Sequence, residues 1–583
     1  MKRFLSRYWK IGATVVFGLA VYCFWLFRYP FALTYQEQLQ LFLFDSDYFA
    51  ERMAEPGGFA RYVAEFLVQF YNGMAIGAAI LAIVYMLIQR LTWRLIRTSD
   101  EHYALSFVPV LMLWYAMGDE SVMLTYAVAM TMAMAVMIGW RRWSEDRKVS
   151  RDIRDVRDSR VSRVSRGIRW CGIVVLIPVL YWLIGPMVVV VALAMLPWTM
   201  GVAAVIYAIA WILLSAHWLP FPMLRIVMGI SYYRVPETLP YMLMAIPVVV
   251  LLLRHFARLM PKTNRLIGMG EAVLVLTVGI ALVRGWGFEA KKYELIEYDY
   301  LVRVQDWNGI IAKAEKQTPD LPMSVSATNL ALGMTNQLGN RAFDFYQRGS
   351  EGLLPKFERN FATTQLTGEI YFWLGLVNTA QRLAFEAMEA IPNYNKSGRV
   401  VKRLAETNLI NGEYKVAEKY LRMLEKTIFY RPWAQRMMAL LGDEKAIDSH
   451  RLYGTLRQLR LTDDFLFSED ELDKICGQLF IHNQKNQMAV QYLLMAPLLD
   501  KDIERFMPYV QVVQNRVNYN PRHIQEGIAF AFMQQRQQPP QGVVSPLILQ
   551  QLNDFARVYS AGSSSPELGR FRNTAWYYLM VGK

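Results

Sequence analysis

The chain has 583 residues, of which 54% are hydrophobic, and its formal net charge is +14. Repeated unbroken apolar runs exclude an ordinary soluble globular protein, because a helix that crosses a bilayer needs about 20 apolar residues. The charge does not indicate nucleic-acid binding, because residues 1–284 carry a net charge of +11 and residues 285–583 only +3. The excess lies in short loops between apolar runs, where the positive-inside rule places it.

Nine apolar runs predict an all-α fold that begins with a polytopic transmembrane helix bundle. The basic N-terminus, MKRFLSRYWK, predicts a retained signal anchor. Basic residues at the span ends put the N-terminus in the cytoplasm, and nine spans then put the C-terminal half on the other side. The region 186–218 is left open between one span and two. The predicted spans are 11–27, 66–88, 103–118, 121–139, 170–184, 186–197, 199–218, 240–253 and 266–284.

Two loops of this predicted domain, residues 1–284, have unusual compositions. The external loop 28–65 is acidic and apolar, and residues 35–49 show near-helical apolar spacing, which predicts an interfacial helix that ends at PGG, Pro56–Gly58. The cytoplasmic loop 140–169 is rich in arginine, which predicts a solvated helix or a basic arm on anionic headgroups.

Residues 285–583 are expected to form a separate domain of helical repeats. The segment VKRLAETNLINGEYKVAEKYLRMLEKTIFYRPWA, Val401–Ala434, has the spacing of a 34-residue tetratricopeptide repeat, with Gly412 at the turn. Residues 370–395 fit a shortened version, and residues 330–349 and 306–319 fit more loosely. Because a lone repeat cannot bury its faces, the pattern predicts a tetratricopeptide-like α-solenoid.

Candidate site residues come from three loops that the predicted topology places on one side of the bilayer. Asp45 and Asp47 lie in the first loop, and Asp119 and Glu120 follow the third span. Such carboxylates can act as a general base or bind a divalent cation, for which Asp45 and Asp119 are the candidate ligands. The candidate substrate-binding residues are Glu37, Arg225, Arg234 and Glu237, since arginine suits phosphate. The alternative is that these charges are only solvated span ends.

Glu65 and Gln69 lie at the start of the second predicted span, and Glu271 lies inside the ninth, close to its end. An ionisable or polar residue inside a span is a functional candidate, and the alternative is that these side chains reach the interface. The chain contains no P-loop, zinc-protease, serine-elbow or CxxC motif, so the sequence gives no support for those chemistries.

Two resemblances add to this interpretation. Through YQEQLQLF, EPGGFARYVAEFLVQF, NLALG, LGLVNTAQRLAFEAME and LAETNLINGEYKVAEKYL, the chain resembles an uncharacterised family of bacterial polytopic membrane proteins of unknown function. Its architecture resembles more weakly the C-type-fold membrane glycosyltransferases, whose first external loop bears a catalytic acid. This resemblance implies that Asp45 or Asp47 matches that acid and that Asp119 or Glu120 matches the second-loop acids. The sequence departs from the pattern, because the first-loop acids lie well past the first span and the second loop is very short.

Two functions are therefore expected of a multi-pass protein of the bacterial inner membrane with a periplasmic C-terminal domain. One is a glycosyltransferase that takes a sugar from a polyprenyl-phosphate-linked donor on the periplasmic face and uses a divalent cation, Mg²⁺ or Mn²⁺. The alternative is a non-catalytic membrane-anchored scaffold for envelope protein assembly. The expected partners are the lipid bilayer, the lipid-linked substrate and a protein on the helical repeats, and no nucleic acid is expected.

Overall fold

A computed structural model describes residues 2–96, 100–152, 173–195, 198–235, 239–256, 259, 264–356, 358, 361–393, 395–462, 471–562 and 566–582. These residues form helices and no β-strand beyond two isolated bridges, which confirms the all-α prediction. The chain divides into two compact units. The first unit comprises Met1–Tyr293 together with two short segments from the C-terminal half, Pro392–Ser397 and Lys426–Phe429, and the second unit comprises the rest. The sequence places this boundary after residue 284.

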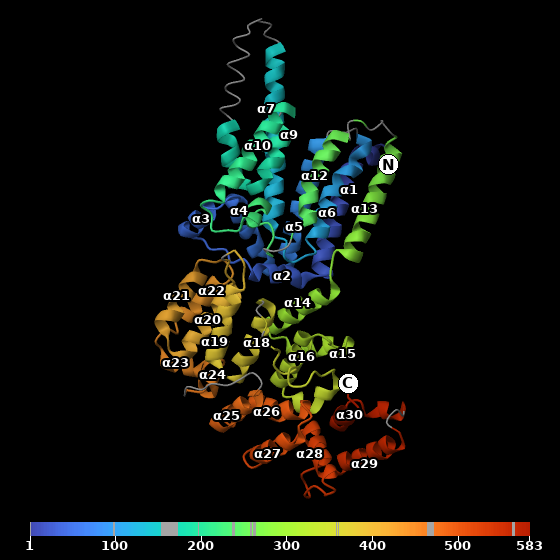
Figure 1. Cartoon of the computed structure of the whole chain (residues 1–583), viewed down its shortest axis with the longest axis vertical. Coiled ribbons are helices and arrows are strands. Elements are labelled where there is room, and N and C mark those ends of the chain that lie inside the picture. Colours follow the sequence, from blue (N-terminus) through green and yellow to red (C-terminus); the bar gives the residue numbers. More distant parts are fainter. Residues whose placement is uncertain are drawn as a thin grey trace. The chain divides into compact units, whose positions relative to one another are not determined.

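The first unit is a bundle of apolar helices that run side by side (Figure 1). Its core contains fully buried aromatic side chains such as Trp25, Trp114 and Tyr85. The helices are α1 Lys2–Phe27, α2 Pro30–Gln38, α3 Ser46–Met53, α4 Gly58–Val68, α5 Met74–Ile96, α6 Val108–Ala116, α7 Leu124–Asp152, α9 Val188–Met195, α10 Trp198–Ser215, α11 Met223–Met228, α12 Tyr241–Phe256 and α13 Arg265–Trp286.

Five helical runs in the described residues are long and apolar enough to cross a membrane, which is fewer than the nine spans predicted. They are Tyr8–Phe27, Met74–Ile96, Leu124–Arg142, Ile173–Ala194 and Leu266–Trp286. Three shorter apolar helices of this unit occupy other predicted spans: His102–Ala116, Gly201–Ser215 and Tyr241–Phe256. Hydropathy locates apolar residues but not helix ends. The longest of these three helices, Tyr241–Phe256, extends only about 24 Å, which is less than the bilayer core of about 30 Å. In the region 186–218, for which the sequence allowed one span or two, α9 and α10 are two separate helices that pack together.

The run Ile173–Ala194 reverses direction at Gly185. Gly185 has a positive φ of 63° and begins the 3-10 turn Gly185–Met187. Ile173 and Ala192 line one cavity of about 20 Å³, although in a straight helix they would lie about 28 Å apart at 1.5 Å per residue. The turn at Gly185 packs against Gly57, whose backbone N–H donates to the carbonyls of Tyr181 and Trp182.

The predicted interfacial helix over residues 35–49 is wrong. The chain leaves α2 at Gln38, runs without helical structure through residues 39–45, and begins α3 at Ser46. Leu39, Phe42 and Leu43 are buried in the unit rather than presented as one apolar stripe to lipid. The predicted break at PGG is present, since Gly57 has a φ of 77° and immediately precedes α4. The predicted span 66–88 is displaced to Met74–Ile96, because residues 58–72 form α4 and a 3-10 turn.

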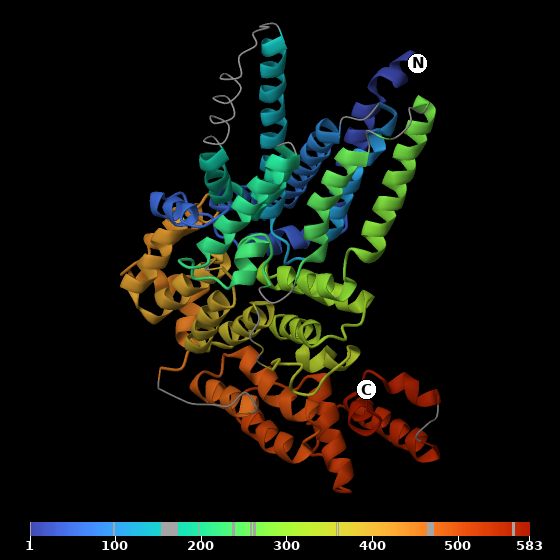
Figure 2. The ribbon, with the colours of Figure 1, turned by 45° about the horizontal axis from the view of Figure 1, so that its top comes forward.

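The second unit consists of helices that pack against their neighbours in the sequence (Figure 2). Its helices are α14 Ala290–Arg303, whose first turn belongs to the first unit, α15 Trp307–Lys316, α16 Pro322–Met334, α17 Leu338–Arg341, α18 Phe361–Leu374, α19 Val377–Glu389, α20 Gly398–Asn411, α21 Tyr414–Glu425, α22 Arg431–Met438, α23 Glu444–Ser449, α24 Tyr453–Leu459, α25 Leu472–His482, α26 Gln487–Leu499, α27 Ile503–Gln514, α28 Arg522–Gln534, α29 Pro546–Ala561 and α30 Ala575–Met580.

The segment predicted as the clearest repeat forms a helix–turn–helix. Helices α20 and α21 pack together, and Gly412 between them has a φ of 82°, a conformation that glycine adopts without steric cost. Leu404, Ala405 and Ala417 are fully buried where the two helices meet. The assignment of this unit to the tetratricopeptide class stays a prediction.

Candidate functional site

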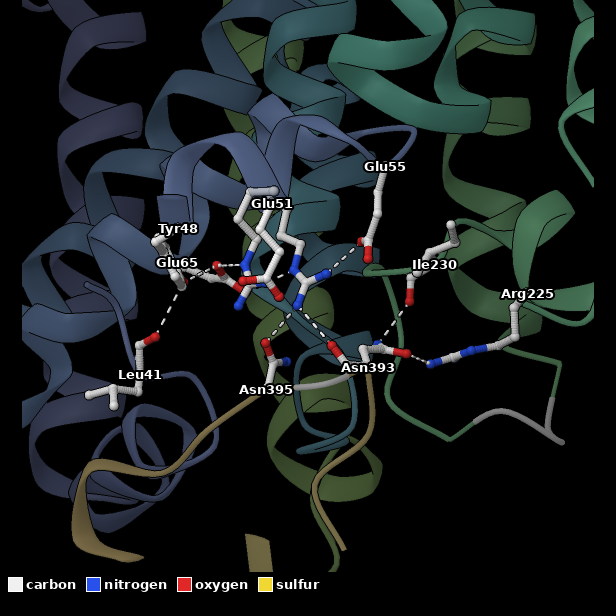
Figure 3. A network of polar contacts seen from close by, with 11 residues as sticks. Leu41, Tyr48, Glu51, Glu55, Glu65, Arg225, Ile230, Asn393 and Asn395 are labelled. Atoms are coloured by element: carbon white, nitrogen blue, oxygen red, sulfur yellow. Dashed lines mark hydrogen bonds and ion pairs between the residues drawn. The ribbon is translucent and has the colours of Figure 1, made fainter. Parts of the chain in front are cut away.

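A buried ionic network lies at the α3–α4 end of the first unit (Figure 3). The carboxylate of Glu65, on α4, is fully buried and accepts hydrogen bonds from Arg52 Nε at 2.8 Å, from Arg61 Nε at 2.9 Å and from the Tyr48 hydroxyl. Burial alone would raise the pKa of Glu65, but the positive charges of Arg61 and Arg52 and the hydroxyl of Tyr48 overcome it and lower that pKa. Glu65 is therefore an ionised structural centre.

The segment Pro392–Ser397 supplies hydrogen-bond acceptors to this network and to a second arginine, Arg225 (Figure 3). Arg61 Nη2 donates to Asn395 Oδ1 at 2.7 Å and to the Asn393 carbonyl at 3.0 Å. Arg225 Nη2 donates to Asn393 Oδ1 at 2.6 Å, and Asn393 Nδ2 donates to the Ile230 carbonyl at 2.9 Å. One loop thus satisfies two buried arginines with neutral oxygen atoms.

The loop that follows α6 carries Asp119 and Glu120 and pairs with residues 232–234. Val122 and Tyr233 form an isolated antiparallel bridge, and the Arg234 backbone N–H donates to the Ser121 carbonyl at 2.8 Å. The Tyr233 hydroxyl donates to Asp119 Oδ2 at 2.7 Å. The structure therefore brings together Asp119, Glu120, Arg225 and Arg234, which the sequence places in two separate loops.

Arg234 is a buried cation with incomplete hydrogen bonding. The residue is 6% exposed, Nη1 donates to the Glu120 carbonyl at 2.7 Å, and Nε and Nη2 have no hydrogen-bond partner among the described residues. Burial lowers the pKa of Arg234 to about 10, although Tyr35, Glu120 and Asp119 act in the opposite direction. Burial also lowers the pKa of Arg225. Within the described residues, neither guanidinium has a carboxylate within ion-pairing distance.

The remaining predicted site residues lie in different surroundings. Asp45 Oδ2 forms a 2.7 Å ion pair with Lys426 Nζ, and Asp47 is exposed in the first turn of α3. Glu120 Oε1 forms a 2.6 Å ion pair with Lys292 Nζ. Glu37 is buried in α2, and Glu237 lies outside the described residues. Gln69 is buried in a 3-10 turn. Glu271 lies within α13, and its Oε2 is 3.7 Å from Nδ1 of His102.

The predicted metal ligands do not fit a divalent cation. The Asp45 carboxylate is paired with a lysine, and the Asp119 carboxylate accepts from Tyr233 and from the Ser121 backbone N–H. A cation of this kind needs several converging oxygen ligands. No three His, Cys, Asp or Glu side chains gather in a metal-holding group anywhere in the part of the chain that the structure describes.

An apolar groove of about 660 Å³ lies between α6, α12 and α13. Leu111, Met242, Val278 and Trp286 are among its lining residues. Tyr115, at the α6 end of the groove, is followed within five residues by Asp119 and Glu120. A groove of this size and character suits an extended apolar chain.

Sequence reasoning missed several residues that organise these sites. Hydropathy does not distinguish single basic residues such as Arg52, Arg61 and Lys292, which lie on α3, α4 and α14. The i,i+4 spacing of Arg61 and Glu65 is a local signal that could have found their ion pair. No local pattern marks Asn393 and Asn395, because their partners are more than 150 residues away in the sequence.

Comparison with known proteins gives one finding. A family model described as a family of unknown function, DUF6057, matches residues 7–582. Neither the comparison with curated proteins nor the comparison with solved structures gave a match. The family match covers nearly the whole chain, including the loops that carry the buried arginine network. The chain therefore belongs to the DUF6057 family.

Proposed function

We propose that this protein is a non-catalytic, multi-pass protein of the bacterial inner membrane that carries a periplasmic helical platform for the assembly of envelope proteins. One observation supports this proposal above the others. The sequence predicts a catalytic role for Asp45 and a substrate-binding role for Arg225. In the structure Asp45 pairs with Lys426 of the segment Lys426–Phe429, and Arg225 donates to Asn393 of the segment Pro392–Ser397. Those segments are continuous with the platform helices α19 to α22.

The platform helices provide the surface for a protein partner. Tetratricopeptide-like pairs such as α20 and α21 stack through small residues at their contacts, and stacks of this kind present extended binding faces. Asn393 and Asn395 then have an anchoring role, because they tie the chain between platform helices to buried arginines of the membrane-embedded unit.

Complementation of a strain that lacks the gene tests this function. The double variant Asp47→Asn/Asp119→Asn is expected to restore the wild-type phenotype, because it removes proposed catalytic charges and leaves both the Asp45–Lys426 ion pair and the asparagine anchor intact. The double variant Asn393→Ala/Asn395→Ala is expected to fail, although its amount in the membrane, measured by immunoblot, matches the wild type. The opposite pair of outcomes, with equal amounts of both variants, would contradict the platform and favour catalysis.

A second candidate function is sugar transfer from a polyprenyl-phosphate-linked donor. The convergence of Asp119, Glu120, Arg234 and Lys292 favours it, as does the apolar groove that ends near the same loop. Proteoliposomes that contain the purified chain and a labelled lipid-linked sugar would then show transfer, and Asp119→Asn would abolish it. If no sugar is transferred from any of a panel of such donors, the sugar-transfer function is contradicted and only the platform function remains.

A further inference from the structure

The loop Pro222–Arg234 buries two arginines, and neither of them forms an ion pair with a carboxylate of the described residues. Arg225 is 5% exposed, and within the described residues its guanidinium donates to three neutral oxygen atoms: the Tyr233 carbonyl at 2.6 Å, the Arg234 carbonyl at 3.2 Å and Asn393 Oδ1. Arg234 is similarly buried, and two of its nitrogen atoms have no partner in the part of the chain that the structure describes. Burying a cation without a counter-charge costs free energy even where neutral oxygen atoms accept its hydrogen bonds, so this arrangement is costly for a purely structural loop.

The contact with Asn393 differs chemically from the other two contacts of Arg225. The Tyr233 and Arg234 carbonyls belong to the same loop as Arg225, whereas Asn393 Oδ1 comes from a segment 168 residues away. An arginine fork prefers two oxygen atoms of a phosphate or carboxylate, and a carboxamide supplies one neutral oxygen in that place. Asn393 therefore occupies the position that an anionic ligand would take.

We propose that Arg225 is the cation of a binding site for a phosphate-type oxyanion, with the positive charge of Arg234 in the same loop, and that the segment Pro392–Ser397 blocks this site through the side chain of Asn393. Binding of the anion displaces the segment, and the segment in turn competes with the anion. The ligand is a free phosphate or the phosphate of a lipid headgroup, which share the same recognition chemistry. This site goes beyond the platform function and would allow an anion to release the anchor of that platform.

The first test measures phosphate affinity for the full-length chain purified in detergent, with potassium chloride of equal ionic strength as the reference. Asn393→Ala removes the competing oxygen and is expected to increase the affinity for inorganic phosphate by about tenfold, which corresponds to one hydrogen bond to a charged group. Adding Arg225→Gln to this variant should cancel the gain. The matched control is Asn378→Ala, which alters an exposed asparagine pair with Asn411 and should leave the affinity unchanged.

The second test follows the segment itself and does not depend on the folding of Asn393→Ala. Ser397 is fully buried, so a cysteine placed there in a Cys23→Ser/Cys171→Ser background, which keeps only the buried Cys476, should react with a maleimide only when the segment is displaced. The labelling rate is expected to rise with inorganic phosphate, or with vesicles in which phosphatidylglycerol replaces phosphatidylcholine, and the two arms identify the source of the phosphate. The rise should disappear with Arg225→Gln.

Two results would overturn the proposal. One is a phosphate affinity of Asn393→Ala equal to that of the wild type, or a gain that survives Arg225→Gln. The other is a Ser397→Cys labelling rate that neither phosphate nor phosphatidylglycerol changes. A purely structural role for Asn393 predicts lower stability in the first variant but neither the affinity gain nor the labelling response.

Discussion

The guanidinium Nε of Arg61 donates a 2.9 Å hydrogen bond to Oε1 of Glu65, and both side chains are almost completely buried. The two residues lie one helical turn apart on α4, so the contact is local to a single helix. Arg52 and Tyr48 then approach Glu65 from α3, and Asn393 and Asn395 approach Arg61 from a distant part of the sequence. This one pair links three segments of the first unit.

Replacement of Glu65 by glutamine should strongly destabilise the first unit. The substitution leaves two buried arginines without their shared carboxylate, and breaking a buried pair in this way costs about 3–5 kcal/mol. The free energy of unfolding in detergent is the measurement. Glu51→Gln is the matched control, because Glu51 pairs with the same Arg52 from a side chain that is 57% exposed, and such a pair contributes about 1 kcal/mol or less. Equal losses in the two variants would contradict a central role for Glu65.

The same pair predicts how stability depends on acid. The pKa of Glu65 is lower in the folded chain than its ordinary value, so the unfolded chain binds this proton at a higher pH than the folded chain does. The stabilisation by Glu65 is therefore complete above about pH 4.3, the ordinary pKa of glutamate, and is lost as the pH falls through the lower folded value. The stability difference between the wild type and Glu65→Gln should shrink in acid. A difference that stays constant down to pH 3 would contradict this assignment.

The sequence predicted well what depends on composition and local pattern. The all-α class and the helix–turn–helix of α20 and α21 follow from apolar runs and from small residues at regular spacing. The sequence predicted helix ends poorly. Hydropathy did not indicate that α4 is a separate helix with a buried Arg61–Glu65 pair, and the second candidate span therefore begins at Met74 instead of residue 66. The sequence could not predict the blocking of Arg225 by Asn393, because a hydrogen bond between residues 168 positions apart leaves no local signal.

Gly118 should not tolerate a side chain. A Cβ at this position would overlap the backbone carbonyl oxygen of Gly287, and backbone atoms cannot move aside as a flexible side chain can. Gly118→Ala is expected to lower the free energy of unfolding by about 1–3 kcal/mol and to reduce the yield of folded protein. Gly139→Ala is the matched control, since a Cβ built there meets no atom within 4 Å among the described residues outside its own helical turn. An unchanged stability of Gly118→Ala would show that the loop before Asp119 can shift freely.

Arg225 and Arg234 should respond in opposite directions to replacement by methionine. Arg225→Met removes the donor for three oxygen atoms, including Asn393 Oδ1, and should destabilise the chain by about 1–3 kcal/mol. Arg234→Met removes a buried charge that makes one side-chain hydrogen bond and should be neutral or stabilising, by about 1–3 kcal/mol. Thermal unfolding of both variants in the absence of phosphate provides the comparison.

The pH dependence of Arg234→Met provides a sharper check than its stability alone. Burial lowers the pKa of Arg234 to about 10, below the value of about 12.5 that arginine has in an unfolded chain. Because the unfolded chain then binds the proton more tightly, the charge costs stability at neutral pH, and the wild type regains this stability as the pH rises through 10. The advantage of Arg234→Met should therefore narrow between pH 9 and 11. A constant advantage over this range would mean that Arg234 is solvated, and the two unpartnered nitrogen atoms would then not indicate an anion site.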